Sequence, residues 1–149
     1  MLIARGNLMS EATKQVLKRW FDEVWNQKRE AAIDELFTPG GLCYGFPDDN
    51  SAIGIEEYKK TYHAFCGAFP DLHVELGEIK EDGNRASAAW VATMTHTGDH
   101  LGFPASGKKV DLHGHSTVEV ANGRILNGWN QVDVASLFQK LQQPEEQSA

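Results

Sequence analysis

Positive charge is scarce in this sequence. Its 149 residues include 14 Lys and Arg against 21 Asp and Glu, which gives a formal net charge of -7. No basic run exceeds a pair such as Lys59-Lys60 or Lys108-Lys109. Nucleic-acid binding depends on a positive surface that neutralises phosphates, so we expect no nucleic-acid partner. An anionic membrane surface is disfavoured for the same reason.

Long apolar runs and cysteines are also few. No run approaches the ~20 apolar residues that a membrane-spanning helix needs, and the opening Met1-Leu2-Ile3-Ala4-Arg5 turns polar too early for a signal peptide. The two cysteines, Cys43 and Cys66, do not form a Cys-x-x-Cys pair, which favours free thiols in a reducing compartment. We therefore expect a cytoplasmic protein without a membrane partner.

The remaining composition, 41% apolar and 23% charged, is typical of a globular protein. This length favours a single domain over residues 1–149, with a core at about residues 10–142. The first third has helical periodicity. The predicted helices are one that follows Ser10 as N-cap and runs past Val24, one at about Arg29–Phe37 that ends in a loop beginning with Thr38-Pro39-Gly40-Gly41, and one at Gly54–Ala68.

The rest of the chain alternates apolar and polar positions, which predicts strands. The predicted strands are Leu72–Glu81, Arg85–Gly98, Lys108–Ala121 and Arg124–Val132, followed by a helix at about Val134–Leu141. Asp82-Gly83-Asn84 and Asn122-Gly123 are strong hairpin signals, because these residues accept positive φ. Together the elements predict an α+β fold, in which a curved, mostly antiparallel sheet wraps around the N-terminal helices, encloses a central pocket and ends in a short helix.

Several stretches occur in the order typical of one family. They are residues 54–60 (GIEEYKK), 68–74 (AFPDLHV), 95–108 (THTGDHLGFPASGK) and 122–129 (NGRILNGW), with Asp133 and residues 137–141 after them. Over roughly residues 12 to 141 the chain resembles the SnoaL-like polyketide cyclase and ester cyclase family. The resemblance implies the cone-shaped fold shared with nuclear transport factor two, scytalone dehydratase and ketosteroid isomerase. It also implies cofactor-free aldol cyclisation of a small hydrophobic carbonyl compound such as a polyketide ester, or a related isomerase or lyase reaction.

Such a cyclisation needs a base that removes a proton next to a carbonyl group, and donors that stabilise the enolate oxygen. The resemblance makes Asp133, four residues after Trp129, the leading candidate for the base, although Arg124 stands where the family often has lysine. The alternative is that Asp133 only caps the last helix. Counting in twos along the strand places five residues on one face: Ile125, Asn127, Trp129, Gln131 and Asp133.

Two histidines share one face of the predicted strand Lys108–Ala121. The resemblance implies a histidine partner on this strand, and we expect His115 to face the pocket in support of Asp133, with His113 as a substrate contact. Alternatively this face, which also carries Asp111, Thr117 and Glu119, is exposed. The buried set would then be Leu112, Gly114, Ser116, Val118 and Val120. For His96 we expect a structural role in the bend after its strand.

Aromatic side chains are candidates for the pocket wall, because a planar ligand packs well against rings. The expected substrate contacts are Trp129, Trp20, Tyr62, Phe65 and, as a hydroxyl donor at the mouth, Tyr44.

Three other functions are open. The spacing of Gly107, His113, His115 and Glu119 is similar to the first half of the cupin metal signature, and two histidines with a glutamate suit a first-row metal. The second half of that signature is absent and predicted helices occupy the place of cupin strands, so we expect no metal. A second alternative is a non-catalytic small-molecule binding domain. A third possibility is a mainly structural association domain, because the resemblance implies pairing through exposed sheet faces. We expect a homodimer or a higher homo-oligomer.

Overall fold

The computed structural model describes residues 13–144, so the N-cap predicted at Ser10 lies outside the described residues. Residues 13–19 are α-helical and continue directly into the π-helix η1 (Trp20–Asn26). The following elements are α2 (Ala31–Leu36), β1 (Phe37–Tyr44), β2 (Ala52–Ile53), α3 (Ile55–Ala68), β3 (His73–Leu76), β4 (Lys80–Asp82), β5 (Arg85–Thr95), β6 (Lys109–Ala121), β7 (Arg124–Val132) and α4 (Val134–Gln142).

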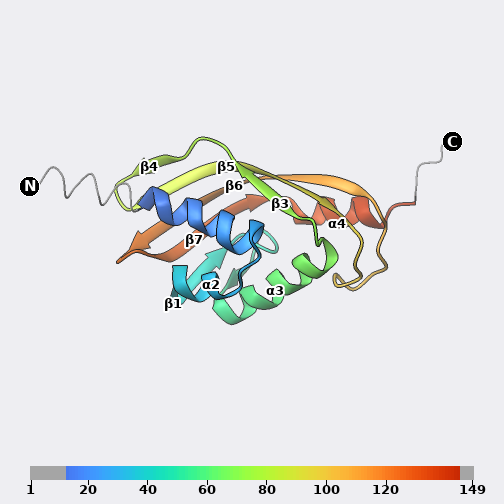
Figure 1. The fold of residues 1–149 in the computed structure, drawn as a ribbon, viewed down its shortest axis with the longest axis horizontal. Helices are drawn as coiled ribbons and strands as arrows, with labels where there is room; N and C mark the ends of the chain where they lie inside the picture. Colours follow the sequence, from blue (N-terminus) through green and yellow to red (C-terminus); the bar gives the residue numbers. More distant parts are fainter. Residues whose placement is uncertain (1–12, 145–149) are drawn as a thin grey trace, which may run out of the picture.

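The strands form one sheet in the order β2-β1-β7-β6-β5-β3, with β4 also paired to β5. The long strands β5, β6 and β7 make the predicted antiparallel meander, and both residues of the Asn122-Gly123 turn have positive φ, 54° and 78°. Figure 1 shows the sheet curving over the first helix and α3. The predicted α+β architecture, with a curved, mostly antiparallel sheet and a short C-terminal helix, is therefore confirmed, and the sheet is open.

Two local predictions are wrong. The strand predicted at Leu72–Glu81 is divided into β3 and β4, and at the break the amide of Gly77 donates to the carbonyl oxygen of Ala89 at 2.7 Å. The segment predicted as a loop from Thr38 onward contains β1, which runs parallel to β7. Glycine suits this strand because a Cβ at Gly41 would collide with the carbonyl oxygen of Leu126 in β7.

A β-bulge in β7 changes which side chains face the core. Val120 of β6 pairs with Ile125, and the preceding Glu119 pairs with Asn127, so Leu126 is the extra residue and is 36% exposed. One extra residue inverts the alternation that follows it. Ile125, Gly128 and Val132 are therefore buried. The set predicted to share a face with Ile125, which includes Asn127, Trp129 and Gln131, lies on the opposite face.

The core fills the space between the concave face of the sheet and the helices. The inner face of α3 buries Tyr58, Tyr62, Phe65 and Ala68. The inner face of β5 carries the short side chains of Ala86, Ala88 and Ala92, and short side chains leave room beside them for larger rings. No helix within residues 13–144 has both the length and the apolar character that a membrane crossing requires.

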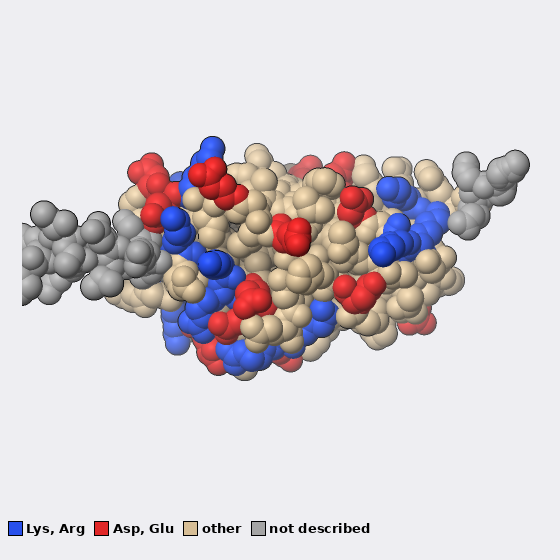
Figure 2. Space-filling model, turned by 45° about the horizontal axis from the view of Figure 1, so that its top comes forward, with Lys and Arg blue, Asp and Glu red and all other residues tan. Residues whose placement is uncertain are grey.

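Charged side chains lie on the outside and alternate in sign. Figure 2 shows Lys and Arg interspersed with Asp and Glu on one face. Around the first helix they form a network in which Arg19 and Arg29 both contact Glu23 at 2.7 Å, and Arg29 also contacts Glu35 at 2.6 Å. Hydrogen bonds from the two arginines lower the pKa of Glu23 to about 2. The network ties the first helix to α2.

Candidate functional site

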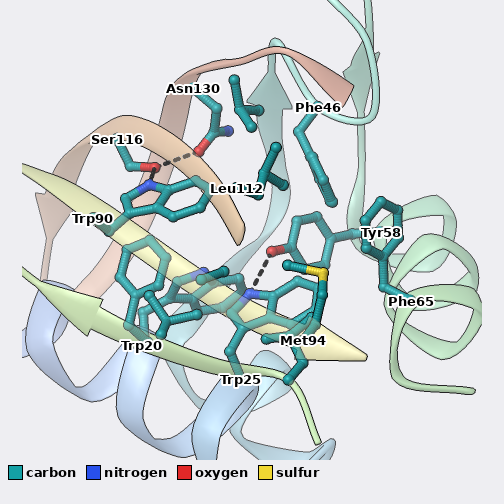
Figure 3. A pocket seen from close by; sticks show the side chains of 15 residues that line it. Trp20, Trp25, Phe46, Tyr58, Phe65, Trp90, Met94, Leu112, Ser116 and Asn130 are labelled. Atoms are coloured by element: carbon teal, nitrogen blue, oxygen red, sulfur yellow. Dashed lines mark hydrogen bonds between the residues drawn. The ribbon is translucent and has the colours of Figure 1, made fainter. Parts of the chain in front are cut away.

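An aromatic chamber lies between the sheet and the helices (Figure 3). Its cavity has a volume of about 50 Å³. Its lining residues are Trp20, Phe21, Trp25, Phe46, Tyr58, Phe65, Leu72, Val74, Trp90, Ala92, Met94, Leu112, Ser116, Asn130 and Val132. None of them is acidic, basic or a histidine. The chamber therefore suits an uncharged ligand with apolar, planar surfaces.

Three polar side chains cross the sheet side of the chamber in one row. The indole N–H of Trp90 donates to Ser116 Oγ at 2.9 Å, and Ser116 Oγ donates to Asn130 Oδ1 at 2.7 Å. The Asn130 amide nitrogen donates to the carbonyl oxygen of Tyr44 at 2.9 Å and to Cys43 Sγ at 3.2 Å. Every donor of this row is engaged, so the row offers a ligand only the remaining lone pairs of Ser116 and Asn130.

Gly114 makes the position of Trp90 possible. The two residues pair directly between β5 and β6, and the indole lies across the glycine. A Cβ at Gly114 would meet the ring at 2.6 Å from Cε2 and 2.7 Å from Cη2, well inside ordinary carbon contact. A side chain at position 114 would thus displace a wall of the chamber.

On the helix side, Tyr58 projects its hydroxyl into the chamber from α3 (Figure 3). The indole N–H of Trp25 donates to this hydroxyl oxygen at 3.1 Å, and the ring of Trp20 packs against Tyr58 with ring centroids 5.4 Å apart. Burial raises the pKa of Tyr58 well above its usual value, so the phenol keeps its proton at neutral pH.

Asp133 lies outside the chamber wall, at the N-cap of α4. Its side chain is exposed and accepts from the amide of Ser136 at 3.0 Å and from the hydroxyl of Ser136 at 2.7 Å. These hydrogen bonds hold the pKa of Asp133 below its usual range. A carboxylate with a lowered pKa is a weak base, so this geometry favours the capping role.

The two histidines of β6 lie on the outer face of the sheet. His113 and His115 are exposed, whereas Ser116, Val118 and Val120 are buried. The structure thus has the alternative arrangement, and it does not bring His115 together with Asp133 or with the chamber. Glu119 accepts from Asn127 at 3.2 Å on the same outer face. Within residues 13–144 no group of three or more potential ligands is arranged to hold a metal ion.

Of the aromatic candidates, Trp20 and Phe65 line the chamber. Tyr62 is buried and packs against Trp25, with ring centroids 5.2 Å apart, but it does not line the chamber. Trp129 and Tyr44 lie outside the chamber and stack on each other, with ring centroids 5.9 Å apart. The guanidinium of Arg85 lies 4.8 Å from the centre of the Trp129 ring.

His96 is fully buried and holds the loop that follows β5. Its Nδ1 accepts from the amide of Ser106 at 3.0 Å, and its ring lies 5.5 Å from both Phe69 and Phe103. Burial lowers the pKa of His96. Its contacts are those of a structural residue, and it does not line the chamber.

Sequence reasoning did not select Trp90, Ser116 or Asn130 for the site. A signal was present for Ser116, which is polar within an otherwise apolar alternating set, from Leu112 to Val120. For Asn130 the bulge at Leu126 removed the signal, because counting in twos assigned Asn130 to the wrong face.

Comparison with known proteins gives a consistent assignment. A family model, SnoaL-like polyketide cyclase, matches residues 15–141. A solved structure from Jannaschia sp. CCS1, described as a SnoaL-like polyketide cyclase, is 23% identical with a TM-score of 0.80, and the match covers 91% of this chain and 95% of that one. AclR from Streptomyces galilaeus, described as a hydroxylase, is 19% identical with a TM-score of 0.79, covering 93% and 86%. IdmH from Streptomyces antibioticus, described as a polyketide cyclase, is 19% identical with a TM-score of 0.73, covering 87% and 97%. At these identities the solved structures show the shared fold. Among functionally curated proteins no match was found.

Proposed function

The chain belongs to the SnoaL-like polyketide cyclase family, and on that premise we propose that its chamber binds an uncharged, hydrophobic carbonyl compound. We further propose a cyclase- or isomerase-type reaction of that compound without a cofactor. The observation that carries this proposal is the lining itself, which combines aromatic rings with a few hydrogen-bonding groups and no charge. Burying a carboxylate there would leave its charge without a partner, which is costly.

The expected chemistry of such a chamber is stabilisation of charge on an oxygen atom. In an aldol cyclisation, negative charge develops on the carbonyl oxygen as the enolate forms, and a fixed donor in an apolar site stabilises it strongly. The wall supplies donors and acceptors but no side chain that accepts a proton readily near neutral pH. Water at the open side of the chamber would then accept this proton, and the alkoxide oxygen regains a proton from water once the carbon–carbon bond has formed.

Ligand charge gives a direct binding test. The probes are 2-acetylnaphthalene, an uncharged ketone, and 2-naphthoate, which has a similar shape but a negative charge at pH 7. Quenching of Trp20, Trp25 and Trp90 fluorescence reports occupancy, and a Trp129→Phe background removes the tryptophan outside the chamber. We expect the ketone to bind at least about tenfold more tightly, because of the cost of burying the charge. Equal or tighter binding of the carboxylate would contradict the proposal.

A second candidate function, binding without turnover, is favoured by the absence of a charged or histidine side chain from the wall. Mass spectrometry of a linear polyketide methyl ester, incubated with the protein, separates the two functions. Aldol addition gives a new isomer of unchanged mass, and subsequent dehydration removes one water. Recovery of the bound ester without any product would identify a binding protein.

A further inference from the structure

We propose that the hydroxyl of Tyr58 donates a hydrogen bond to the carbonyl oxygen of the ligand and polarises it, an inference that rests on the proposed function of the chamber. Tyr58 lines the chamber from α3 and is only 6% exposed. Figure 3 shows its hydroxyl between the aromatic rings of the chamber.

The proton of this hydroxyl is the free donor. A phenol has one proton to give, and the oxygen of Tyr58 already accepts from the indole of Trp25 at 3.1 Å. Within the described part of the chain, Tyr58 donates to no acceptor, although its side chain is buried. A buried donor without an acceptor is unfavourable, and a ligand oxygen would remove that cost. The Trp90-Ser116-Asn130 row cannot take this role, because all of its donors are used within the protein.

The indole of Trp25 strengthens Tyr58 as a donor. When the ligand oxygen gains negative charge, the Tyr58 O–H bond polarises and charge density moves onto the phenolic oxygen. Trp25 donates to that oxygen with its N–H group, and linked hydrogen bonds of this kind reinforce one another. The proton stays on Tyr58 throughout and no covalent bond changes.

The same contacts define a class of ligand. Tyr58 approaches from the helix side and offers a donor, whereas Ser116 and Asn130, on the sheet, offer only lone pairs. A ligand that satisfies both sides has a carbonyl oxygen toward α3 and a hydroxyl or enol O–H toward the sheet. Hydroxylated aromatic ketones have this pattern.

The test compares two ligands and two variants. The ligands are 2-acetylnaphthalene and 2-ethylnaphthalene, which has no carbonyl group. Tyr58→Phe removes the donor, and Tyr62→Phe is the matched control, because it removes a hydroxyl from the same helix outside the lining. In the wild type we expect the C=O stretch of the bound ketone to lie below its value in an apolar solvent. In Tyr58→Phe it should return to that value, with ketone affinity about 2- to 10-fold weaker. Affinity for the hydrocarbon should not change.

Unchanged C=O frequency in Tyr58→Phe would overturn the assignment, as would an equal loss of affinity for both ligands. If that variant fails to fold, Trp25→Phe serves instead. It keeps the Tyr58 proton but removes the indole that donates to the Tyr58 oxygen. A smaller frequency shift is therefore expected, and an unaltered shift refutes the role of that indole. A wild-type protein that binds neither ligand would contradict the proposed function, whereas binding of the ketone without any shift contradicts Tyr58 alone.

Discussion

Replacing Gly114 by alanine should displace the indole of Trp90 and weaken both the fold and the chamber. The added Cβ would lie 2.6 Å and 2.7 Å from two carbons of the ring, against ~3.5–4.0 Å for ordinary carbon contacts. The ring must therefore retreat by about 1 Å. This movement stretches the 2.9 Å hydrogen bond from Trp90 to Ser116.

The size of the effect follows from three contributions. Overpacking of a well-filled core costs about 1–3 kcal/mol, and the lost hydrogen bond about 1 kcal/mol. Removing a glycine from a strand returns about 0.5–1 kcal/mol. The free energy of unfolding should fall by roughly 1–3 kcal/mol, and the melting temperature by roughly 3–10 °C for a protein of this size.

Urea unfolding of Gly114→Ala and Gly128→Ala provides the measurement and its control. Gly128 lies in β7, and a Cβ there would have its nearest neighbour at 3.9 Å, so we expect this variant to gain about 0.5–1 kcal/mol of stability from the loss of a strand glycine. The near-ultraviolet circular dichroism of Trp90 and the affinity for 2-acetylnaphthalene should change only in Gly114→Ala. In a Trp90→Ala background, alanine at position 114 should be tolerated. Equal stability of the two single variants would refute the steric explanation.

Three further predictions concern titratable groups. Asp133→Asn should keep the helix cap and any turnover, whereas Asp133→Ala should lose the cap and lower the urea midpoint. Loss of turnover in a stably folded Asp133→Asn protein would instead identify a base. Because burial lowers the pKa of His96 below 6.5, its stabilising contribution is present above that pH and is lost as the pH falls. The urea midpoint of His96→Gln should therefore change less between pH 7.5 and 5 than that of the wild type, and parallel curves would contradict this. The pKa of Glu23 is lowered from 4.5 to about 2 by Arg19 and Arg29, so its stabilising contribution is present above pH 4.5 and is lost as the pH falls toward 2. In Glu23→Gln the melting temperature should therefore fall less steeply between pH 4.5 and 2 than in the wild type. An equal fall in both proteins would count against the network.

The fold was largely predictable because its elements are encoded locally. The predicted strand Arg124–Val132 and the helices at Gly54–Ala68 and Val134–Leu141 agree with β7, α3 and α4 to within a residue. Periodicity and turn residues act over a few neighbours, so sequence alone contains them. By contrast, β1 includes Pro39 and two glycines, which disfavour a strand. It forms because β7, more than 80 residues away, pairs with it, and no local pattern reports such a partner.

The site was less predictable because it depends on which face each side chain occupies. For β6 the alternating pattern was compatible with either face being buried. Whether His115 or Ser116 faces the chamber depends on which side of the sheet the helices cover, and a pattern within one strand does not contain that information. On β7 a single extra residue, Leu126, determined that Asn130 faces the chamber and Trp129 does not. A β-bulge changes which face of the sheet the following side chains occupy, and the residue types around Leu126 do not indicate one. The family resemblance identified the fold but did not resolve this one-residue shift.

The parallel pairing of β1 with β7 has a consequence for how the chain acquires its structure. Phe37 lies beside Ile125, and Tyr44 beside Trp129, so these contacts join residues 85 or more positions apart. During synthesis, the first helix, α2 and β1 leave the ribosome long before β7 exists to cover them. Their apolar side chains, Leu36 and Phe37 among them, therefore lack their native packing partners until β7 has been synthesised. Such long-range contacts slow folding and expose the nascent chain to aggregation. We expect folding to begin in the β5-β6-β7 meander, where contacts are local, and to be completed only when β1 docks against its edge.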